Sequence, residues 1–403
     1  MAPAELTGTG AGDAVGSAPA AGMRVAVDAV AAGAGLLPGA GPLRHTTVNL
    51  VAALADLAPR SIWHVFCPAF AVLHELADHP NVRLHPVRAA RSRPLRVVYQ
   101  HTGYPLALRR VRPDVTLHTV NVAPPFGPRP RVVMLRSLQC FTQPRQFGWL
   151  RRRYLQFAVR RSLRGADRVV AGSQAAANDA VRLLSLDPDR LRVVPHGLAP
   201  HIASKLEEPP PARRTQRPYL LAVSTLYGHK NYPRLLQAFA ALHRRQAIPH
   251  ELRIAGADAD LTAADLRRMA VELGISDAVS LLGPVPHDRI ASHYQQADAL
   301  VYVSLAETFG HPPLEAMACG CPVIASNASS LPEVTGRAAE LVDPTDVQSV
   351  ASAIERVVTR PQRRAELVAG GRQRARDFTW PRAAERLLPV LQEVARSPAS
   401  TRS

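Results

Sequence analysis

The chain has 403 residues, 47% of them hydrophobic and 20% charged, which is typical of a soluble globular protein long enough for two domains. Four scattered cysteines without a CxxC pair argue against a disulfide framework and against structural zinc. The sequence contains no run of eighteen apolar residues, so no transmembrane helix is expected. The formal charge of +17 lies mostly in residues 1–200, where 25 arginines face 11 acids, and suggests an anionic partner.

The first half alternates strands and helices. Residues 1–22 form an Ala/Gly-rich tail without the features of a signal peptide, so we expect a disordered tail and a cytoplasmic protein. A strand over 23–30, a Gly-rich loop over 33–42 and a helix over 45–58 follow. Further strands are predicted in this half, at 62–68, 82–87, 115–120 and 132–137, and from 166 and 191 into loops, together with a basic helix around 149–164.

The Pro-rich and charged segment 204–218 is predicted to be a linker between two domains. After it the alternation of strands and helices restarts with YLLAVSTL and continues past residue 350. We therefore expect an α/β protein with an N-terminal domain over 23–203, a C-terminal domain over 219–380 and a last helix from 381 that returns towards the first domain. Ligands of such folds bind at the carboxyl ends of the strands, so the cleft between the domains is the expected site.

Residues 306–326, AETFGHPPLEAMACGCPVIAS, hold the main chemical signal. Glu307 follows a buried strand, and the prolines after His311 suit the first turn of a helix that carries Glu315. The TFGH loop (308–311) lies between the two carboxylates, where backbone N–H groups and the helix N-terminus can bind an anion. The paired prolines and glutamates thus predict a site that binds a phosphate and nearby sugar hydroxyls.

This stretch, with its Glu, seven residues and Glu, resembles the retaining glycosyltransferases of family 4. The resemblance extends in order and spacing to VSTLYGHKNYPRLLQAFAAL, LRIAG, VSLLGPVPHDRIASHYQQADALVYVSLAE, GCPVIASNASSLPEVTGRAAELVDPTD and the late FTW, and in the first half to ADRVVAGSQAAANDAV and LRVVPHGL. It implies the GT-B architecture, in which two Rossmann-like domains face each other across a cleft. It also implies a nucleotide-diphosphate sugar as donor and neither a metal nor any other cofactor. DADLTAAD (258–265) offers no isolated DxD motif.

The resemblance assigns roles to the residues of the second domain. Lys230, one of two lysines in the chain, falls at the family's phosphate-binding position, and the TFGH loop supplies dipoles to the diphosphate. Glu315 is expected to bind the ribose and Glu307 the donor sugar. The remaining donor-binding candidates are Thr308, Phe309, Gly310, His311, Thr225, His229, His196 and Gly197.

Several of these candidates have a second possible interpretation. Thr225 and His229 stand where many relatives have arginine, so His229 would contact phosphate as a cation only when protonated. His311 occupies an often apolar position and is a candidate for donor choice. His196 and Gly197 either line the cleft or form a structural turn.

The first domain departs from the family pattern. Many relatives have a His-Asp pair after the strand that corresponds to VVMLRS, and Arg136 and Ser137 stand there instead. The role of that histidine is therefore absent, taken by Arg136, or taken by His118. In the loop 33–42, Gly33, Gly35, Gly39 and Gly41 either allow close approach of phosphate or acceptor or simply make the loop flexible.

The segment 145–165 has Leu150, Tyr154, Phe157 and Ala158 on one helical face, with six arginines between 151 and 164. One interpretation is a helix that packs its apolar stripe on the sheet. The other is a peripheral contact with an anionic membrane at the inner face of the cell.

Together these features predict a retaining, metal-independent glycosyltransferase that moves a hexosyl group to an acceptor hydroxyl. The acceptor is either a cell-surface or lipid-linked glycan or a small natural-product aglycone. A sugar-nucleotide epimerase on the same scaffold is the enzyme alternative, which the ETFGHPPLE motif disfavours. A basic nucleic-acid-binding protein is the non-enzymatic alternative, and the 5% aromatic content disfavours it, so no nucleic-acid partner is expected.

Overall fold

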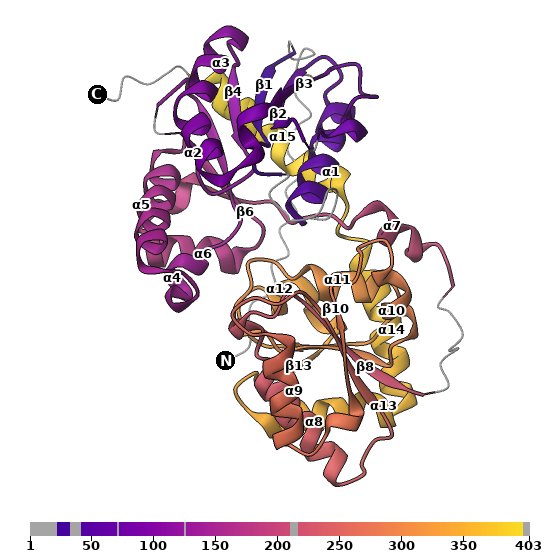
Figure 1. Ribbon diagram of the computed structural model, residues 1–403. Helices are drawn as coiled ribbons and strands as arrows, with labels where there is room; N and C mark the ends of the chain where they lie inside the picture. The colour runs from indigo at the N-terminus through magenta and orange to yellow at the C-terminus, as the bar shows by residue number, and fades with distance from the viewer. Residues whose placement is uncertain (1–21, 33–41, 71, 125, 210–216, 398–403) are drawn as a thin grey trace.

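The computed structural model describes residues 22–32, 42–70, 72–124, 126–209 and 217–397. Two parallel sheets, each covered by helices on both faces, form an upper and a lower domain (Figure 1). Both sheets have the doubly wound strand order in which the chain starts in the middle and turns back. The expected α/β fold of two Rossmann-like domains is thus confirmed.

The first sheet has seven strands in the order β3-β2-β1-β4-β5-β6-β7, and every neighbouring pair is parallel. Its strands are β1 (Arg24–Asp28), β2 (Ile62–Pro68), β3 (Val82–Val87), β4 (Val115–His118), β5 (Arg131–Leu135), β6 (Arg168–Ala171) and β7 (Leu191–Val193). The helices are α1 (Pro42–Leu57), α2 (Arg93–His101), α3 (Gly103–Val111), α4 (Gln139–Thr142), α5 (Trp149–Gly165) and α6 (Gln174–Leu184).

The second sheet has six parallel strands in the order β10-β9-β8-β11-β12-β13. The strands are β8 (Tyr219–Val223), β9 (Glu251–Ala255), β10 (Val279–Gly283), β11 (Ala299–Tyr302), β12 (Val323–Ser326) and β13 (Glu340–Val342). The helices are α8 (Tyr232–Arg244), α9 (Ala263–Glu272), α10 (Ile290–Gln296), α11 (His311–Ala318), α12 (Leu331–Thr335), α13 (Val347–Thr359) and α14 (Pro361–Ala375). No helix in the described ranges combines the length and apolarity needed to cross a bilayer.

Two sequence predictions need correction here. The beginning of the predicted linker is packed, because α7 (Pro200–Ala203) and the turn Ser204–Leu206 bury Ile202 and Leu206 in the second domain. The carbonyl of Leu206 accepts a hydrogen bond from Arg372 at 2.7 Å. The apolar stripe of α5 does not pack on the sheet, since Leu150, Tyr154 and Phe157 are exposed.

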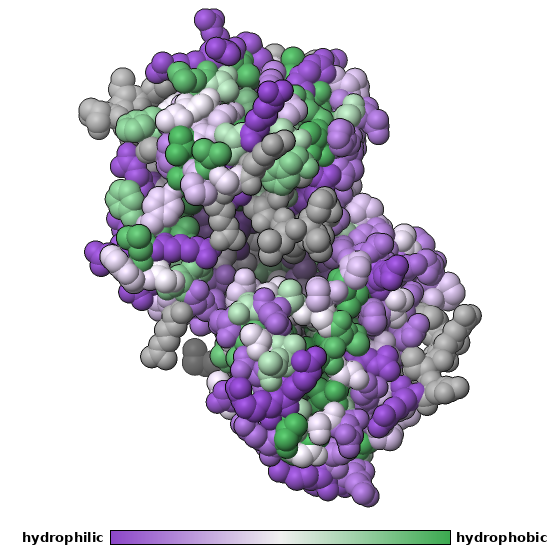
Figure 2. Space-filling view, in the orientation of Figure 1, coloured by the Kyte–Doolittle hydropathy of each residue, from purple (hydrophilic) through white to green (hydrophobic). Residues whose placement is uncertain are grey.

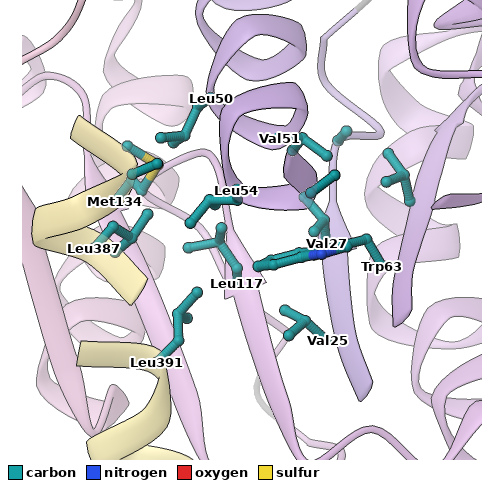
Figure 3. Packing of buried hydrophobic residues seen from close by; sticks show 14 of the residues in the cluster. Val25, Val27, Leu50, Val51, Leu54, Trp63, Leu117, Met134, Leu387 and Leu391 are labelled. Carbon is teal, nitrogen blue, oxygen red and sulfur yellow. The ribbon is translucent and has the colours of Figure 1, made fainter. Parts of the chain in front are cut away.

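The last helix, α15 (Trp380–Arg396), belongs to the first domain although it follows the second in sequence. Its residues Leu387 and Leu391 are fully buried in one cluster with Leu54 of α1, Leu117 of β4 and Met134 of β5 (Figure 3). The chain therefore crosses between the domains twice, and the two crossings touch where Leu198 N donates to the carbonyl of Phe378 at 3.0 Å.

Replacing Leu387 with alanine should lower the free energy of unfolding of the first domain by about 2–5 kcal/mol, because it leaves a cavity between α15 and the sheet. Urea denaturation followed by circular dichroism measures the loss. Glu385→Ala, an exposed position on the same helix, should be nearly neutral. Equal stability of the two variants would mean that α15 is not packed as described.

Candidate active site

The site lies where the second sheet changes direction. β8 and β11 are neighbours in the sheet, and their connections leave towards opposite faces, so a crevice opens at their carboxyl ends. The turn Gly228–Lys230 follows β8, and Glu307 follows β11. The carbonyl of His229 accepts hydrogen bonds from Leu305 N at 2.8 Å and Ser304 Oγ at 3.1 Å, which fixes the first loop against the second.

Lys230 and Glu307 form a half-buried ion pair with a tyrosine between them. Lys230 Nζ lies 2.5 Å from Glu307 Oε1 and 2.8 Å from Tyr302 Oη, and the tyrosine donates to the same carboxylate oxygen at 2.7 Å. Burial alone would raise the pKa of Glu307, but Lys230 and the hydrogen bond from Tyr302 hold it below its ordinary value. Burial raises the pKa of Tyr302, so the phenol stays neutral and remains a donor.

The loop between the two glutamates is held by hydroxyl groups. The carbonyls of Glu307, Thr308 and Phe309 accept hydrogen bonds from the side chains of Ser329, Ser173 and Ser330 at 2.6–2.8 Å. In a trans peptide the N–H points opposite to the carbonyl, so each following N–H is directed away from its serine. These serines fix the direction of successive N–H dipoles, as a preorganised anion site requires.

Glycine is needed at the end of this loop. Gly310 has φ +111°, a conformation that side chains rarely adopt, and an added Cβ would come within 2.7 Å of Leu331. The following prolines, Pro312 and Pro313, lack N–H groups, so the first turn of α11 contributes fewer donors than an ordinary helix. An anion bound at the start of α11 would therefore depend more on the N–H groups of the loop than on those of the helix.

Glu315 is buried on α11 and already has two partners. His287 Nε2 lies 3.2 Å from one carboxylate oxygen, and Tyr294 Oη donates to the other at 3.1 Å. Burial would raise the pKa of Glu315, but His287 and Tyr294 hold it below its usual range. Each carboxylate oxygen keeps a lone pair for a further donor, so the group can still accept ligand hydroxyls.

Both domains contribute to a second chain of contacts. Arg136, after β5, donates through Nη1 to His196 Nε2 at 3.2 Å, and His196 Nδ1 lies 3.0 Å from His311 Nε2. Burial lowers the pKa of His196 well below 6.5 and that of His311 to about 4, so both rings are neutral at neutral pH. Because arginine only donates, His196 must accept at Nε2 and donate from Nδ1, which leaves the proton of His311 on its Nδ1.

Arg136 is a buried cation with unused donor capacity. Its Nε donates to the carbonyl of Thr119 at 2.9 Å, and its own carbonyl accepts from Thr308 Oγ1 at 2.9 Å. Burial lowers the pKa of Arg136 to about 10, so the side chain stays charged at neutral pH. Its Nη2 is buried without a hydrogen-bond partner in the described part of the chain. An anion beside Arg136 would satisfy that donor.

The other residues predicted for the site have different surroundings. His118 is fully buried in the first domain, 3.3 Å from Asp28, so Arg136 rather than His118 contacts the 307–311 loop. Burial, with Lys230 adding to it, lowers the pKa of His229 to about 4, and its ring contacts Gln139 and Gln146 of the first domain. His229 is therefore neutral, and a phosphate contact through it would be a plain hydrogen bond.

Three further candidates lie at the edges of the site. Thr225 is exposed in the loop after β8. Phe309 is buried against His196 and Phe378, and it lines a cavity of about 190 Å³ between the domains. Gly197 has no room for a side chain, because a Cβ would lie 2.5 Å from the backbone N of Trp380. That contact supports the structural alternative for Gly197.

Some residues of the site escaped the sequence analysis. Tyr302, Tyr294, His287 and Ser329 come from separate segments, and their hydrogen bonds to the glutamates depend on the fold. The position of Tyr302 at the end of the buried strand before Glu307 was the available signal. The loop 33–42 with its glycines lies outside the described residues, apart from Pro42 at the start of α1. No three or more His, Cys, Asp or Glu side chains within the described ranges are arranged to hold a metal ion.

Comparison with known proteins covers most of the chain. The family description "Glycosyl transferases group 1" matches residues 204–374, and "Glycosyltransferase Family 4" matches 45–201. D-inositol 3-phosphate glycosyltransferase of Acidothermus cellulolyticus is 32% identical over 57% of this chain and 53% of its own length. O-antigen chain mannosyltransferase B of Escherichia coli is 29% identical over 66% of this chain and 71% of its own length. The chain thus spans about half the length of the inositol-phosphate relatives.

Solved structures agree with the GT-B fold. Sucrose-phosphate synthase from Thermosynechococcus elongatus superposes with a TM-score of 0.71 at 20% identity, covering 93% of this chain and all of that one. Anabaena HepE, solved in complex with UDP and glucose, superposes with a TM-score of 0.65 at 19% identity, covering 92% of this chain and all of that one.

The pairing of His287 with Glu315 gives a pH-dependent prediction. The hydrogen bond that His287 donates to the carboxylate of Glu315 raises the pKa of His287 above 6.5, against the opposing effect of burial. Because the pKa of His287 is raised in the folded state, its pairing with Glu315 stabilises the fold fully at pH values below the unfolded-state pKa. This stabilisation is lost as the pH rises through the folded-state pKa. Glu315→Gln should therefore lower the pKa of His287, as measured by NMR titration. Glu333→Gln should leave that pKa unchanged, and an unchanged value in Glu315→Gln would contradict the pairing.

Proposed function

Because the chain belongs to the group 1 glycosyl transferases of family 4, we propose that it is a retaining, metal-independent glycosyltransferase. It moves a hexosyl group from a nucleotide-diphosphate sugar to an acceptor hydroxyl. The observation that carries this proposal is the half-buried ion pair of Lys230 and Glu307 with Tyr302. It lies beside a loop with fixed N–H groups that leads into α11, the helix of Glu315. Two carboxylates and one ammonium at the carboxyl ends of parallel strands suit a diphosphate with a sugar on either side.

Different groups of the site would bind different parts of the donor, according to their charge. Lys230, the N–H groups after Glu307 and the free Nη2 of Arg136 would receive the diphosphate. Glu315 would accept from the ribose hydroxyls and Glu307 from those of the transferred sugar. As the donor binds, Lys230 would turn from Glu307 towards the phosphate, so that one ion pair would be exchanged for another.

The reaction then requires that the protein stabilise the leaving diphosphate, and it requires no nucleophile from the protein. The bond between the anomeric carbon and the phosphate oxygen breaks, and its electron pair stays on the diphosphate. The acceptor oxygen bonds to the same face of the anomeric carbon, and its proton passes to the leaving phosphate. Lys230 and the loop dipoles act on the developing negative charge, where preorganised contacts have their largest effect.

The acceptor is either a lipid-linked or cell-surface glycan or a small natural-product aglycone. The names of two relatives, one for D-inositol 3-phosphate and one for the O-antigen chain, support both acceptor classes as candidates. The carboxyl ends of β1 and β4, where the first sheet changes direction, form the corresponding position for an acceptor in the first domain. Asp28 and His118 lie there.

Lys230→Ala should reduce kcat by roughly 10²–10³-fold, because it removes one preorganised cation from the leaving diphosphate. The donor is first selected by thermal shift among UDP-, GDP- and dTDP-sugars, and steady-state kinetics then give kcat. Lys205→Ala is the matched control, since Lys205 is the only other lysine and pairs with Glu208 away from the site. Wild-type turnover in Lys230→Ala with intact folding would remove Lys230 from the mechanism.

Transfer should continue unchanged in EDTA, because fixed cations take the place of a divalent ion on the diphosphate. The same assay with added Mg²⁺ or Mn²⁺ completes the comparison. Loss of activity in EDTA that is restored by a divalent metal would refute the metal-independent part of the proposal while leaving glycosyl transfer intact.

A further inference from the structure

One face of the first domain carries exposed apolar side chains on several elements. α2, α3 and α5 cover the same side of the sheet: α3 buries Leu108 against Ala26, and α5 buries Leu163 against Val133. Ala26 and Val133 face one way, whereas Val27 and Leu117 face α1 and α15 on the other side.

The outer surface of these helices is unusually apolar. Its large hydrophobic side chains are between 41% and 71% exposed, and they are Leu95, Val98, Leu106, Phe126, Trp149, Leu150, Tyr154 and Phe157. We call this set the apolar face. Figure 2 shows hydrophobic side chains interspersed with hydrophilic ones along the left flank of the upper domain, where Figure 1 places α2 and α5. A patch of this kind on a monomer marks an interaction surface.

The loop that carries Phe126 joins the helices into one surface. Gly127 lies against Pro105 of α3, and Ala123 N donates to Ser162 Oγ of α5 at 2.7 Å. The chain on either side of Phe126 therefore contacts both α3 and α5.

Charge on this surface has a single sign. Residues 92–165 contain fifteen arginines, of which Arg131 and Arg136 are buried, and one acid, Asp114, which accepts a hydrogen bond from Arg24 N at 2.7 Å. Within the part of the chain that the structure describes, no carboxylate forms an ion pair with an arginine of α5. Two of its arginines, Arg151 and Arg160, lie over the rings of Phe147 and Phe141.

We propose that the apolar face docks the protein onto the surface of an anionic lipid bilayer. Aliphatic and aromatic side chains of an interfacial helix enter the boundary between headgroups and acyl chains, while surrounding arginines contact lipid phosphates. Trp149 and Tyr154 are the residue types enriched at that depth. The protein then lies on the membrane without crossing it.

Other occupants fit these observations less well. A second copy would bring two strongly basic surfaces together, which like-charge repulsion opposes. A single-stranded nucleic acid needs rings on which bases stack, whereas half of the apolar face is leucine and valine. Both remain distinguishable outcomes of the test.

Membrane docking narrows the acceptor class. An enzyme held at a bilayer meets acceptors carried on lipids, so a lipid-linked acceptor is favoured over a soluble aglycone. This last step rests on the proposed function, whereas docking itself does not.

The test is cosedimentation of the full chain with vesicles of phosphatidylcholine alone or with about one-third phosphatidylglycerol at low salt. The wild type should bind the anionic vesicles, with binding that weakens as salt rises. The double variant Trp149→Ser/Phe157→Ser should lower the partition coefficient roughly tenfold or more. Val271→Ser, at a 66% exposed apolar position on α9 of the second domain, is the matched control and should bind as the wild type does.

A second pair of variants tests the charge. Arg151→Gln/Arg153→Gln should weaken anionic-vesicle binding by about fivefold per arginine, whereas Arg267→Gln on α9 should not. Circular dichroism and donor turnover confirm that each variant is folded and active, which separates docking from the proposed function. Absence of wild-type binding to anionic vesicles, or binding that survives the Trp149/Phe157 double variant, overturns the proposal. The proposal is also overturned if the wild type binds no vesicles but forms a dimer or a nucleic-acid complex that the double variant abolishes.

Discussion

The ion pair between Lys230 and Glu307 is the constraint on which the site depends. Burying a charge pair is costly unless every partner is placed well, and Tyr302 supplies the third contact to the same oxygen. The pair exists because β8 and β11 are neighbours whose loops meet at one edge of the sheet. It also keeps the ammonium of Lys230 in the crevice, where the proposed exchange of the carboxylate for a donor phosphate would take place.

The two domains meet around this pair through polar contacts. Thr308 connects to Ser173 and Arg136 of the first domain, and His196 bridges Arg136 to His311. Because both histidines are neutral, the chain of donors runs in one direction from the guanidinium to α11. The neutral ring of His311 accepts the hydrogen bond from Nδ1 of His196 and stacks on that ring. A domain movement would have to break this chain.

The sequence predicted the structural features that depend on local sequence pattern. Alternating strands and helices implied two parallel sheets, and the glutamates around GHPP implied a strand end, a loop and a helix. Long-range contacts were not predictable in this way. Tyr302, His287 and Ser329 reach the glutamates only after the chain has folded, and the neutral state of His229 follows from burial beneath Gln139 and Gln146.

The Arg-rich helix α5 is a second example of what the sequence pattern could not predict. Periodicity showed that Leu150, Tyr154 and Phe157 share a face, but periodicity does not say whether that face meets the sheet or the solvent. Val159 and Leu163 fill the contact with the sheet instead, which leaves the more apolar stripe outside. The helices α2 and α3 were not predicted, because Leu95, Val98 and Leu106 face outward and Gly103 and Pro105 interrupt the pattern.

A crystal structure with the selected nucleotide-diphosphate sugar tests the central claim most directly. We expect that Lys230 leaves Glu307 and contacts the diphosphate, that Glu315 accepts from the ribose hydroxyls, and that Glu307 turns to the transferred sugar. A bound donor whose phosphates avoid Lys230 while its ion pair with Glu307 stays intact, or whose ribose lies away from Glu315, would contradict it.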